Sequence, residues 1–182
     1  SQPGAAAPVP IRRRDTPSHA AMHDTPLLLL KQRPPPTART ALEAVTPPAL
    51  GGEPARSLYI HVPFCFHKCH YCDFYSVVDT QDRQGSFLAR LEAELIAIAP
   101  WARGTPLRTV FVGGGTPSLL RTELWERLLA VLHSAFDLSL MGPGQPGEFT
   151  VECNPETVSE ELMRVLRAGG VTRVSVGAQS FD

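Results

Sequence analysis

Three of the chain's cysteines, Cys65, Cys69 and Cys72, lie in one short segment with the spacing C-x3-C-x2-C. Thiolates are ligands of zinc and of iron–sulfur clusters. Three thiolates on a tight loop can hold three irons of a cubane cluster, which leaves the fourth iron without a protein ligand. An amino acid can chelate that iron through its adjacent amine and carboxylate, and so can the methionyl end of S-adenosylmethionine (SAM). The spacing therefore indicates a [4Fe–4S] cluster held by these cysteines and open to a ligand such as SAM.

The same segment could instead bind a zinc ion. His61, His67 or His70 would complete a closed Cys3His site. Structural zinc sites usually draw their ligands from two separated pairs, whereas the three cysteines are crowded together here, so the cluster is the preferred interpretation. Cys153, with apolar neighbours in an expected strand, is interpreted as a buried structural residue.

The elements that must position the cysteines alternate between strands and helices after residue 55. Short apolar runs predict strands, and apolar stripes at helical spacing predict helices. In chain order we expect a strand at 58–62, a helix at about 82–99, a strand at 109–112, a helix with the inner stripe Leu124, Leu128, Leu132 and Phe136, a strand at 149–153, a helix, and a strand at 171–176. This order predicts an α/β fold with a parallel sheet covered by helices.

Two local patterns mark the ends of the last helix. Thr157 and Glu160 have the spacing of a capping box at its start, and Gly169 and Gly170 end it. The cysteines follow the first strand, and ligands of parallel α/β sheets bind outside the carboxyl ends of the strands. The sheet therefore predicts a binding site at the end where the cysteines lie.

The chain divides near residue 55 into two parts of different composition. Residues 1–55 hold 11 of the 18 prolines, and we expect them to form a disordered, proline-rich extension. Residues 56–182 form the expected core domain. Four parallel strands leave a flank of the sheet open, so we interpret this domain as incomplete and the chain as the N-terminal part of a longer protein.

Charge and hydropathy limit the classes of function that the chain can have. The formal net charge of −1 gives no basic excess of the kind that nucleic-acid binding requires, so no nucleic-acid partner is expected. The longest run of large apolar residues, at 27–30, is far shorter than the roughly 20 residues of a membrane-spanning helix, so no transmembrane segment is expected. Clustered cysteines suit a reducing compartment, and the cytoplasm is the expected location.

The segment 58–74, which contains the cysteines, resembles the radical SAM family. More narrowly, it resembles the branch that contains oxygen-independent coproporphyrinogen III oxidases and heme chaperones. Three later segments, at 110–118, 150–155 and 173–181, resemble the same branch in the same order. The resemblance covers nearly all of residues 57–182. It implies the N-terminal part of a partial (β/α)6 TIM-like barrel, ending after about the fourth strand.

The resemblance also implies roles for individual residues. Cys65, Cys69 and Cys72 would ligate the [4Fe–4S] cluster. Tyr71 would lie along SAM, although it could instead shield the cluster from water. Tyr59 matches a position that contacts SAM, although a half-buried strand tyrosine is equally compatible with the sequence.

The later motifs would supply the remaining contacts to SAM. Gly114, Gly115 and Thr116 would meet its amino-acid end, where the absence of side chains on the glycines permits close approach. Glu152 would accept hydrogen bonds from both ribose hydroxyls; its alternative role is to pair with a lysine or arginine. Gln179 matches a glutamine that contacts SAM.

Phe74 separates two functions within the branch. The oxidases resemble C-x3-C-x2-C-x-C, whereas here Phe74 stands two residues after the third cysteine, as in the heme chaperones. The resemblance therefore implies a protein that binds heme and passes it to an acceptor protein. The alternative is a coproporphyrinogen III dehydrogenase that decarboxylates two propionates by radical chemistry with SAM. Heme or a porphyrin, an electron donor and a heme-acceptor protein are the expected partners; whether the chain acts as an enzyme stays open.

Overall fold

The computed structural model of the chain describes residues 53–178. The expected extension at 1–55 lies outside the described residues except for its last three positions. Of these, Ala55 donates its backbone N–H to the carbonyl of Trp101 at 3.0 Å. The described chain is therefore tied to the folded core two residues before its first strand begins.

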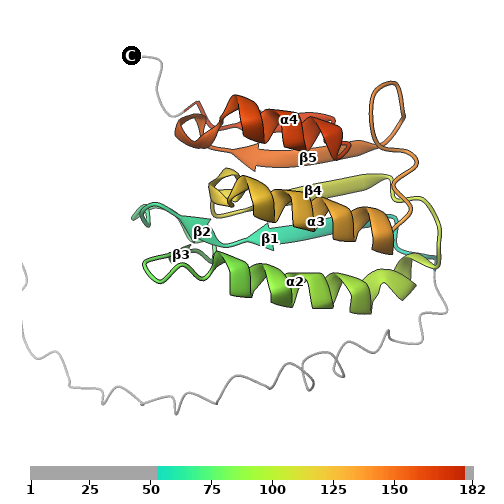
Figure 1. Ribbon diagram of the computed structural model, residues 1–182, viewed down its shortest axis with the longest axis horizontal. Helices are drawn as coiled ribbons and strands as arrows, with labels where there is room; N and C mark the ends of the chain where they lie inside the picture. Colours follow the sequence, from blue (N-terminus) through green and yellow to red (C-terminus); the bar gives the residue numbers. More distant parts are fainter. Residues whose placement is uncertain (1–52, 179–182) are drawn as a thin grey trace, which may run out of the picture. The chain divides into compact units, whose positions relative to one another are not determined.

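Four parallel strands form the central sheet (Figure 1). They are β1 (Ser57–Val62), β4 (Thr109–Gly114), β5 (Glu148–Cys153) and β6 (Arg173–Val176), and they lie side by side in this order. The predicted parallel sheet is thereby confirmed. A second, two-stranded sheet pairs β2 (Phe64–Cys65) with β3 (Val77–Val78), which the sequence analysis did not anticipate.

Three helices connect the strands and lie along one face of the sheet (Figure 1). They are α2 (Gln84–Ile98), α3 (Thr122–Ala135) and α4 (Glu160–Ala168). Strands that follow each other in both sequence and space, joined by crossovers of the same hand, place every helix on the same side. Three short 3-10 turns, η1 (Ala99–Ala102), η2 (Pro117–Leu119) and η3 (Pro155–Thr157), complete the connections.

The core lies between the helices and one face of the sheet. Alternate strand residues are buried there against helix side chains: Ile60, Val62, Val110, Val112, Phe149 and Val151 from the sheet, with Leu88, Leu95, Trp125, Leu128, Leu132, Leu162 and Leu166 from the helices. The residues between them point to the opposite face, where Tyr59 is 56% exposed. The sheet thus has one apolar face and one face available to a ligand.

No helix among residues 53–178 is long and apolar enough to span a membrane.

The last strand is shorter than predicted. It begins at Arg173 rather than at residue 171, because Val171 donates its N–H to the carbonyl of Leu166 and so closes α4. Thr172 then turns into the sheet, where its Oγ1 accepts the N–H of Phe149 at 2.9 Å. Backbone groups that the pattern assigned to a strand therefore complete the helix end instead.

The predicted capping box of α4 is wrong. Ser159, not Thr157, is the N-cap, and its side-chain oxygen accepts the N–H of Leu162 at 3.1 Å. Thr157 belongs to η3, where its hydroxyl donates to the carbonyl of Asn154. The box fails because the Thr157 hydroxyl is already engaged in the preceding turn.

Replacing Ser159 by alanine removes the oxygen that caps α4, so we expect the free energy of unfolding to fall by about 1 kcal/mol. Glu160→Gln is the matched control, because Glu160 pairs with Arg164 at the surface and such pairs contribute roughly 0.3–0.5 kcal/mol. Urea titration measures both variants. A loss in Glu160→Gln as large as that in Ser159→Ala would contradict this assignment of the cap.

Candidate cofactor site

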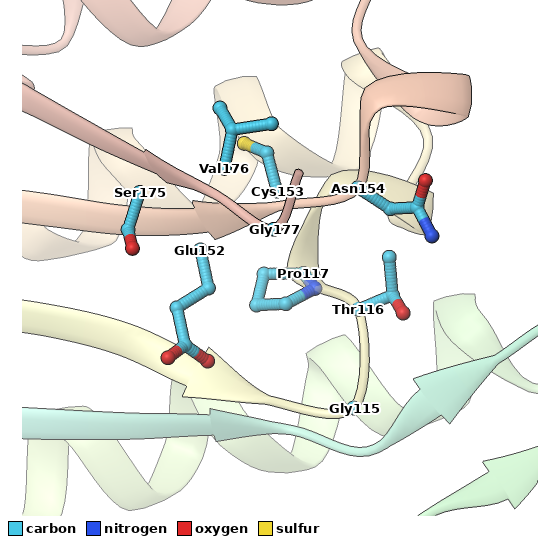
Figure 2. Close-up of a pocket in the computed structure, with 9 residues that line it drawn as sticks. All are labelled: Gly115, Thr116, Pro117, Glu152, Cys153, Asn154, Ser175, Val176 and Gly177. Atoms are coloured by element: carbon cyan, nitrogen blue, oxygen red, sulfur yellow. The ribbon is translucent and has the colours of Figure 1, made fainter. Parts of the chain in front are cut away.

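A cavity of about 280 Å³ opens at the carboxyl edge of the sheet (Figure 2). The ends of three neighbouring strands and the residues that follow them form its wall: Gly115, Thr116 and Pro117 after β4, Glu152, Cys153 and Asn154 around the end of β5, and Ser175, Val176 and Gly177 around the end of β6. Three residues predicted to contact SAM, Gly115, Thr116 and Glu152, are thus brought together. The cavity lies where parallel α/β sheets place their ligands.

Glu152 is held against the end of β4. Gly114 donates its backbone N–H to Glu152 Oε2 at 3.2 Å, and Figure 2 shows the carboxylate directed from β5 towards β4. A Cβ atom on Gly113 would lie 2.7 Å from the same oxygen, so the missing side chain makes room for the carboxylate. No pairing of Glu152 with a lysine or arginine is seen among residues 53–178. The acid is therefore oriented by the backbone while its charge faces the open side of the sheet.

The charge of Glu152 acts on two neighbouring groups. Burial raises the pKa of the Tyr59 phenol, and the Glu152 carboxylate raises it further. Burial likewise raises the pKa of the Cys153 thiol; a hydrogen bond with Ser118 acts in the opposite direction, and Glu152 adds to the rise. Burial and the nearby carboxylate thus both favour the neutral forms of the Tyr59 phenol and the Cys153 thiol.

The other two glycines make room for other segments of the chain. Gly114 has φ +120°, and a Cβ there would lie 2.7 Å from the ring of His61. A Cβ on Gly115 would lie 2.6 Å from the carbonyl oxygen of Phe64, in the connection that leads to the cysteines. The glycine run thus serves first to let β1, β4 and the cysteine segment approach each other. Gly115 also borders the cavity, whereas Gly114 is not part of its wall.

His61 joins β1 to the far end of the cysteine loop. Its Nε2 lies 2.8 Å from the carbonyl oxygen of Tyr75, and its Nδ1 lies 3.2 Å from the hydroxyl of Tyr59. Because a carbonyl only accepts, Nε2 carries the proton and Nδ1 accepts from the phenol. Both ring nitrogens are therefore engaged, which argues against His61 as the fourth ligand of a zinc ion.

The cysteine loop is held at both ends. Cys65 ends β2, and Val77, at the start of β3, donates its N–H to the carbonyl of Pro63 at 2.8 Å. At the loop's beginning, Thr116 Oγ1 lies 3.9 Å from Cys65 Sγ, so the glycine motif touches the first cysteine. Pairing of β2 with β3 closes the loop without any contribution from its interior.

Tyr71 lies beside two of the cysteines. A turn brings the N–H of Cys72 to the carbonyl of Cys69 at 3.1 Å. A hydrogen bond with the Cys69 side chain raises the pKa of the Tyr71 phenol, and the charges of Cys69 and Cys72 add to this. Tyr71 is 78% exposed and lies outside the cavity wall. It therefore belongs to the cysteine loop rather than to the cavity.

The arrangement of the thiols bears on which metal they fit. Cys65, Cys69 and Cys72 are all free and partly exposed. Within residues 53–178, no group of three or more histidine, cysteine, aspartate or glutamate side chains is placed so as to hold a metal ion. A cubane cluster binds each of its cysteines through a different iron. Three thiols on one loop are the type of donor that such a cluster takes, and they would leave one iron open.

Some site residues were predicted and others were missed. Tyr59 lies on the open face of β1, near Glu152 but outside the cavity wall, and Gln179 lies outside the described residues. Asn154 and Ser175 line the cavity and were not predicted. Ser175 pairs in register with Glu152 across β5 and β6. Knowledge of this register would have placed Ser175 beside Glu152, but the sequence pattern does not reveal the register. Cys153 is buried as predicted, yet it borders the cavity.

Together these features define a parallel α/β protein that binds its ligands beyond the carboxyl ends of its strands, with a thiol-rich loop beside the cavity.

The chain belongs to the radical SAM superfamily, which residues 59–182 match. It is 39% identical to the heme chaperone HemW of Bacillus subtilis over 131 residues, which are 70% of this chain and 32% of that protein. It is 36% identical to the heme chaperone HemW of Escherichia coli over 130 residues, 71% of this chain and 33% of that protein. An oxygen-independent coproporphyrinogen III oxidase of Bradyrhizobium diazoefficiens is 33% identical over 128 residues, 69% of this chain and 27% of that protein.

The fold of the chain is also similar to a solved structure. Coproporphyrinogen III oxidase (HemN) from Escherichia coli, a radical SAM enzyme, superimposes with a TM-score of 0.64 at 31% identity, over 79% of this chain and 32% of that one. The chain spans about a third of the length of the curated relatives it matches. The parallel sheet described above is therefore part of the radical SAM fold.

Gly114→Ala should destabilise the protein more than Gly142→Ala does. Both glycines have strongly positive φ, +120° and +112°, so the backbone strain is shared. Only at Gly114 would the new methyl group meet a side chain, the His61 ring, whereas nothing lies within 4 Å at Gly142. We expect an additional loss of about 1–3 kcal/mol in the free energy of unfolding, the usual effect of overpacking. Equal losses in chemical denaturation would show that the His61 ring moves aside freely.

Proposed function

We propose that the chain is the cofactor-binding part of a heme chaperone of the radical SAM superfamily, which binds heme and transfers it to an acceptor protein. In this proposal Cys65, Cys69 and Cys72 ligate a [4Fe–4S] cluster, and SAM occupies the cavity at the carboxyl edge of the sheet. Superfamily membership supports both cofactors. Several relatives of the chain are named heme chaperones, which supports the function.

The observation that carries the proposal is Phe74, two residues after Cys72. An oxidase of this branch is expected to have a further cysteine there, whereas a phenylalanine cannot ligate iron. Phe74 is 65% exposed, and with Tyr71, Cys72 and Asp73 it lines a hollow of about 410 Å³ beside the cysteine loop. Phe74 thus presents an apolar side chain next to the cluster site. Such a side chain can contact a planar, apolar molecule such as heme, but it cannot serve as a further metal ligand.

The residues of the cavity have distinct tasks in binding SAM. Glu152, oriented by the Gly114 N–H, accepts hydrogen bonds from the ribose hydroxyls. Gly115 and Thr116 meet the amino-acid end near Cys65, since Thr116 touches both the cavity and that cysteine. Gln179 adds a contact beyond β6. When bound, the cluster and SAM together supply one-electron chemistry, while the protein orients them and excludes water.

Tyr59 and Tyr71 flank the cofactors from two sides. Tyr59 is fixed through His61 and stacks near Phe111, with ring centroids 6.0 Å apart. Tyr71 is hydrogen-bonded to the Cys69 side chain, and its aromatic ring would lie along the cationic SAM when SAM is bound. An electron donor and a heme-acceptor protein complete the system. Free cysteines suit the reducing cytoplasm, which we propose as its location.

The second candidate function is that of a coproporphyrinogen III dehydrogenase, which decarboxylates two propionates of its substrate. One specific observation favours it: the similar solved structure is a coproporphyrinogen III oxidase. Its cofactor site would be built from the same residues. The two functions therefore differ in what happens to the tetrapyrrole, and the distinction must be made by turnover.

The cysteine assignment predicts the metal content of four variants. Cys65→Ala, Cys69→Ala and Cys72→Ala should each lose most of the iron and sulfide after anaerobic reconstitution, because each removes the ligand of one iron. Cys153→Ala is the matched control and should keep the full content, because Cys153 is buried away from the loop. Colorimetric iron and sulfide analysis measures both. Full content in all three loop variants, or one zinc and no sulfide in the wild type, would contradict the assignment.

The tetrapyrrole chemistry separates the two candidate functions. Full-length, reconstituted protein with SAM, reductant and coproporphyrinogen III should form no protoporphyrinogen, and the same protein should form a stable complex with heme. Chromatography of the extracted porphyrins and the heme absorption spectrum give the two results. Substantial protoporphyrinogen formation would instead establish the dehydrogenase, whether or not heme binds.

A further inference from the structure

Three residues at the edge of the cavity form a closed ring of hydrogen bonds. Ser118 lies in η2, after β4, and is 5% exposed. Thr157 ends η3, after β5, and Asn154 lies between β5 and that turn. The backbone N–H of Asn154 donates to Ser118 Oγ at 3.0 Å, and Thr157 Oγ1 donates to the carbonyl of Asn154 at 2.9 Å. A hydrogen bond between the two hydroxyls closes the ring.

Backbone groups and hydroxyls share the bonds of the ring. Asn154 donates through its backbone N–H to Ser118 Oγ and accepts through its carbonyl from Thr157 Oγ1. Either hydroxyl can be the donor in the bond between Ser118 and Thr157. Loss of either hydroxyl removes the direct bond between the two turns.

The ring joins two loops that both line the cavity. Thr116 and Pro117 line it immediately before Ser118 in the sequence, and Asn154 lines it from the loop after β5 (Figure 2). Ser118 and Thr157 are absent from the cavity wall themselves. On its other side η2 is bonded to a helix, since Trp125 Nε1 donates to the Pro117 carbonyl at 3.2 Å. The hydroxyl ring thus links η2 directly to the loop after β5.

We propose that Ser118 and Thr157 are positioning residues for SAM, which keep the loop after β4 and the loop after β5 at the separation that the ligand requires. This inference rests on the proposed function in one respect, since it takes SAM as the occupant of the cavity. The ring holds Thr116 and Asn154 in place before SAM arrives, so the binding site is preformed. Without the ring, binding must order these loops, and the affinity falls.

The test uses a matched pair of substitutions in the full-length, anaerobically reconstituted protein. Thr157→Val keeps the shape of the side chain but removes the hydroxyl, whereas Thr157→Ser keeps the hydroxyl. We expect the dissociation constant of SAM, measured by isothermal titration calorimetry, to rise roughly five- to tenfold in Thr157→Val and to stay within about twofold of the wild type in Thr157→Ser. Iron and sulfide content should remain unchanged in both. Ser118→Ala provides a second variant with the expected behaviour of Thr157→Val.

Ser134→Ala is the control for loss of a hydroxyl elsewhere, because Ser134 donates to the carbonyl of Val131 on the exposed side of α3. It should bind SAM as the wild type does. A lower melting temperature with unchanged SAM affinity in both Thr157→Val and Ser118→Ala would overturn the inference and leave the proposed function standing. A wild-type protein that holds its cluster but does not bind SAM would overturn both.

Discussion

Three consecutive glycines at the end of β4 are the constraint on which the whole site depends. Each allows a different part of the chain to come close: Gly113 admits the carboxylate of Glu152, Gly114 the ring of His61, and Gly115 the backbone at Phe64. The acid, the histidine and the approach to the cysteines therefore meet around one stretch of backbone. The apolar face of the sheet is committed to the helices, so this crowding occurs where a ligand can enter.

Two kinds of hydrogen bond stabilise what the glycines bring together. On the open face, polar side chains are oriented by backbone groups, as Glu152 is by the Gly114 N–H. At the edge of the cavity, the Ser118 and Thr157 hydroxyls join turns that belong to different strands. Both kinds join residues that lie far apart in the sequence and close together in the fold. The cavity is therefore a property of the folded sheet rather than of any one motif, although each motif contributes residues to it.

Local pattern was sufficient for most of the fold. Short apolar runs located the four strands of the central sheet, although the last one begins two residues later than predicted, and the resemblance of four segments indicated the family that the comparisons confirm. Local sequence pattern was insufficient where one side chain has several possible partners: the Thr157 hydroxyl is hydrogen-bonded to Ser118 instead of capping α4. It was also insufficient where register decides the neighbours, so Ser175 was missed beside Glu152. The roles of the residues assigned to the cluster and to SAM all depend on the bound ligands and remain predictions.

The cysteine loop is closed by elements outside it: β2 pairs with β3, and His61 holds the carbonyl of Tyr75. Bringing the ends of such a loop together costs conformational entropy. Here the folding of the chain already includes that cost, so the binding of iron would not have to overcome it. Many small metal-binding domains fold only as their metal arrives. In this protein the ends of the loop are fixed by its own strands and by His61, so the cluster that we propose would bind between ends that the fold already holds together.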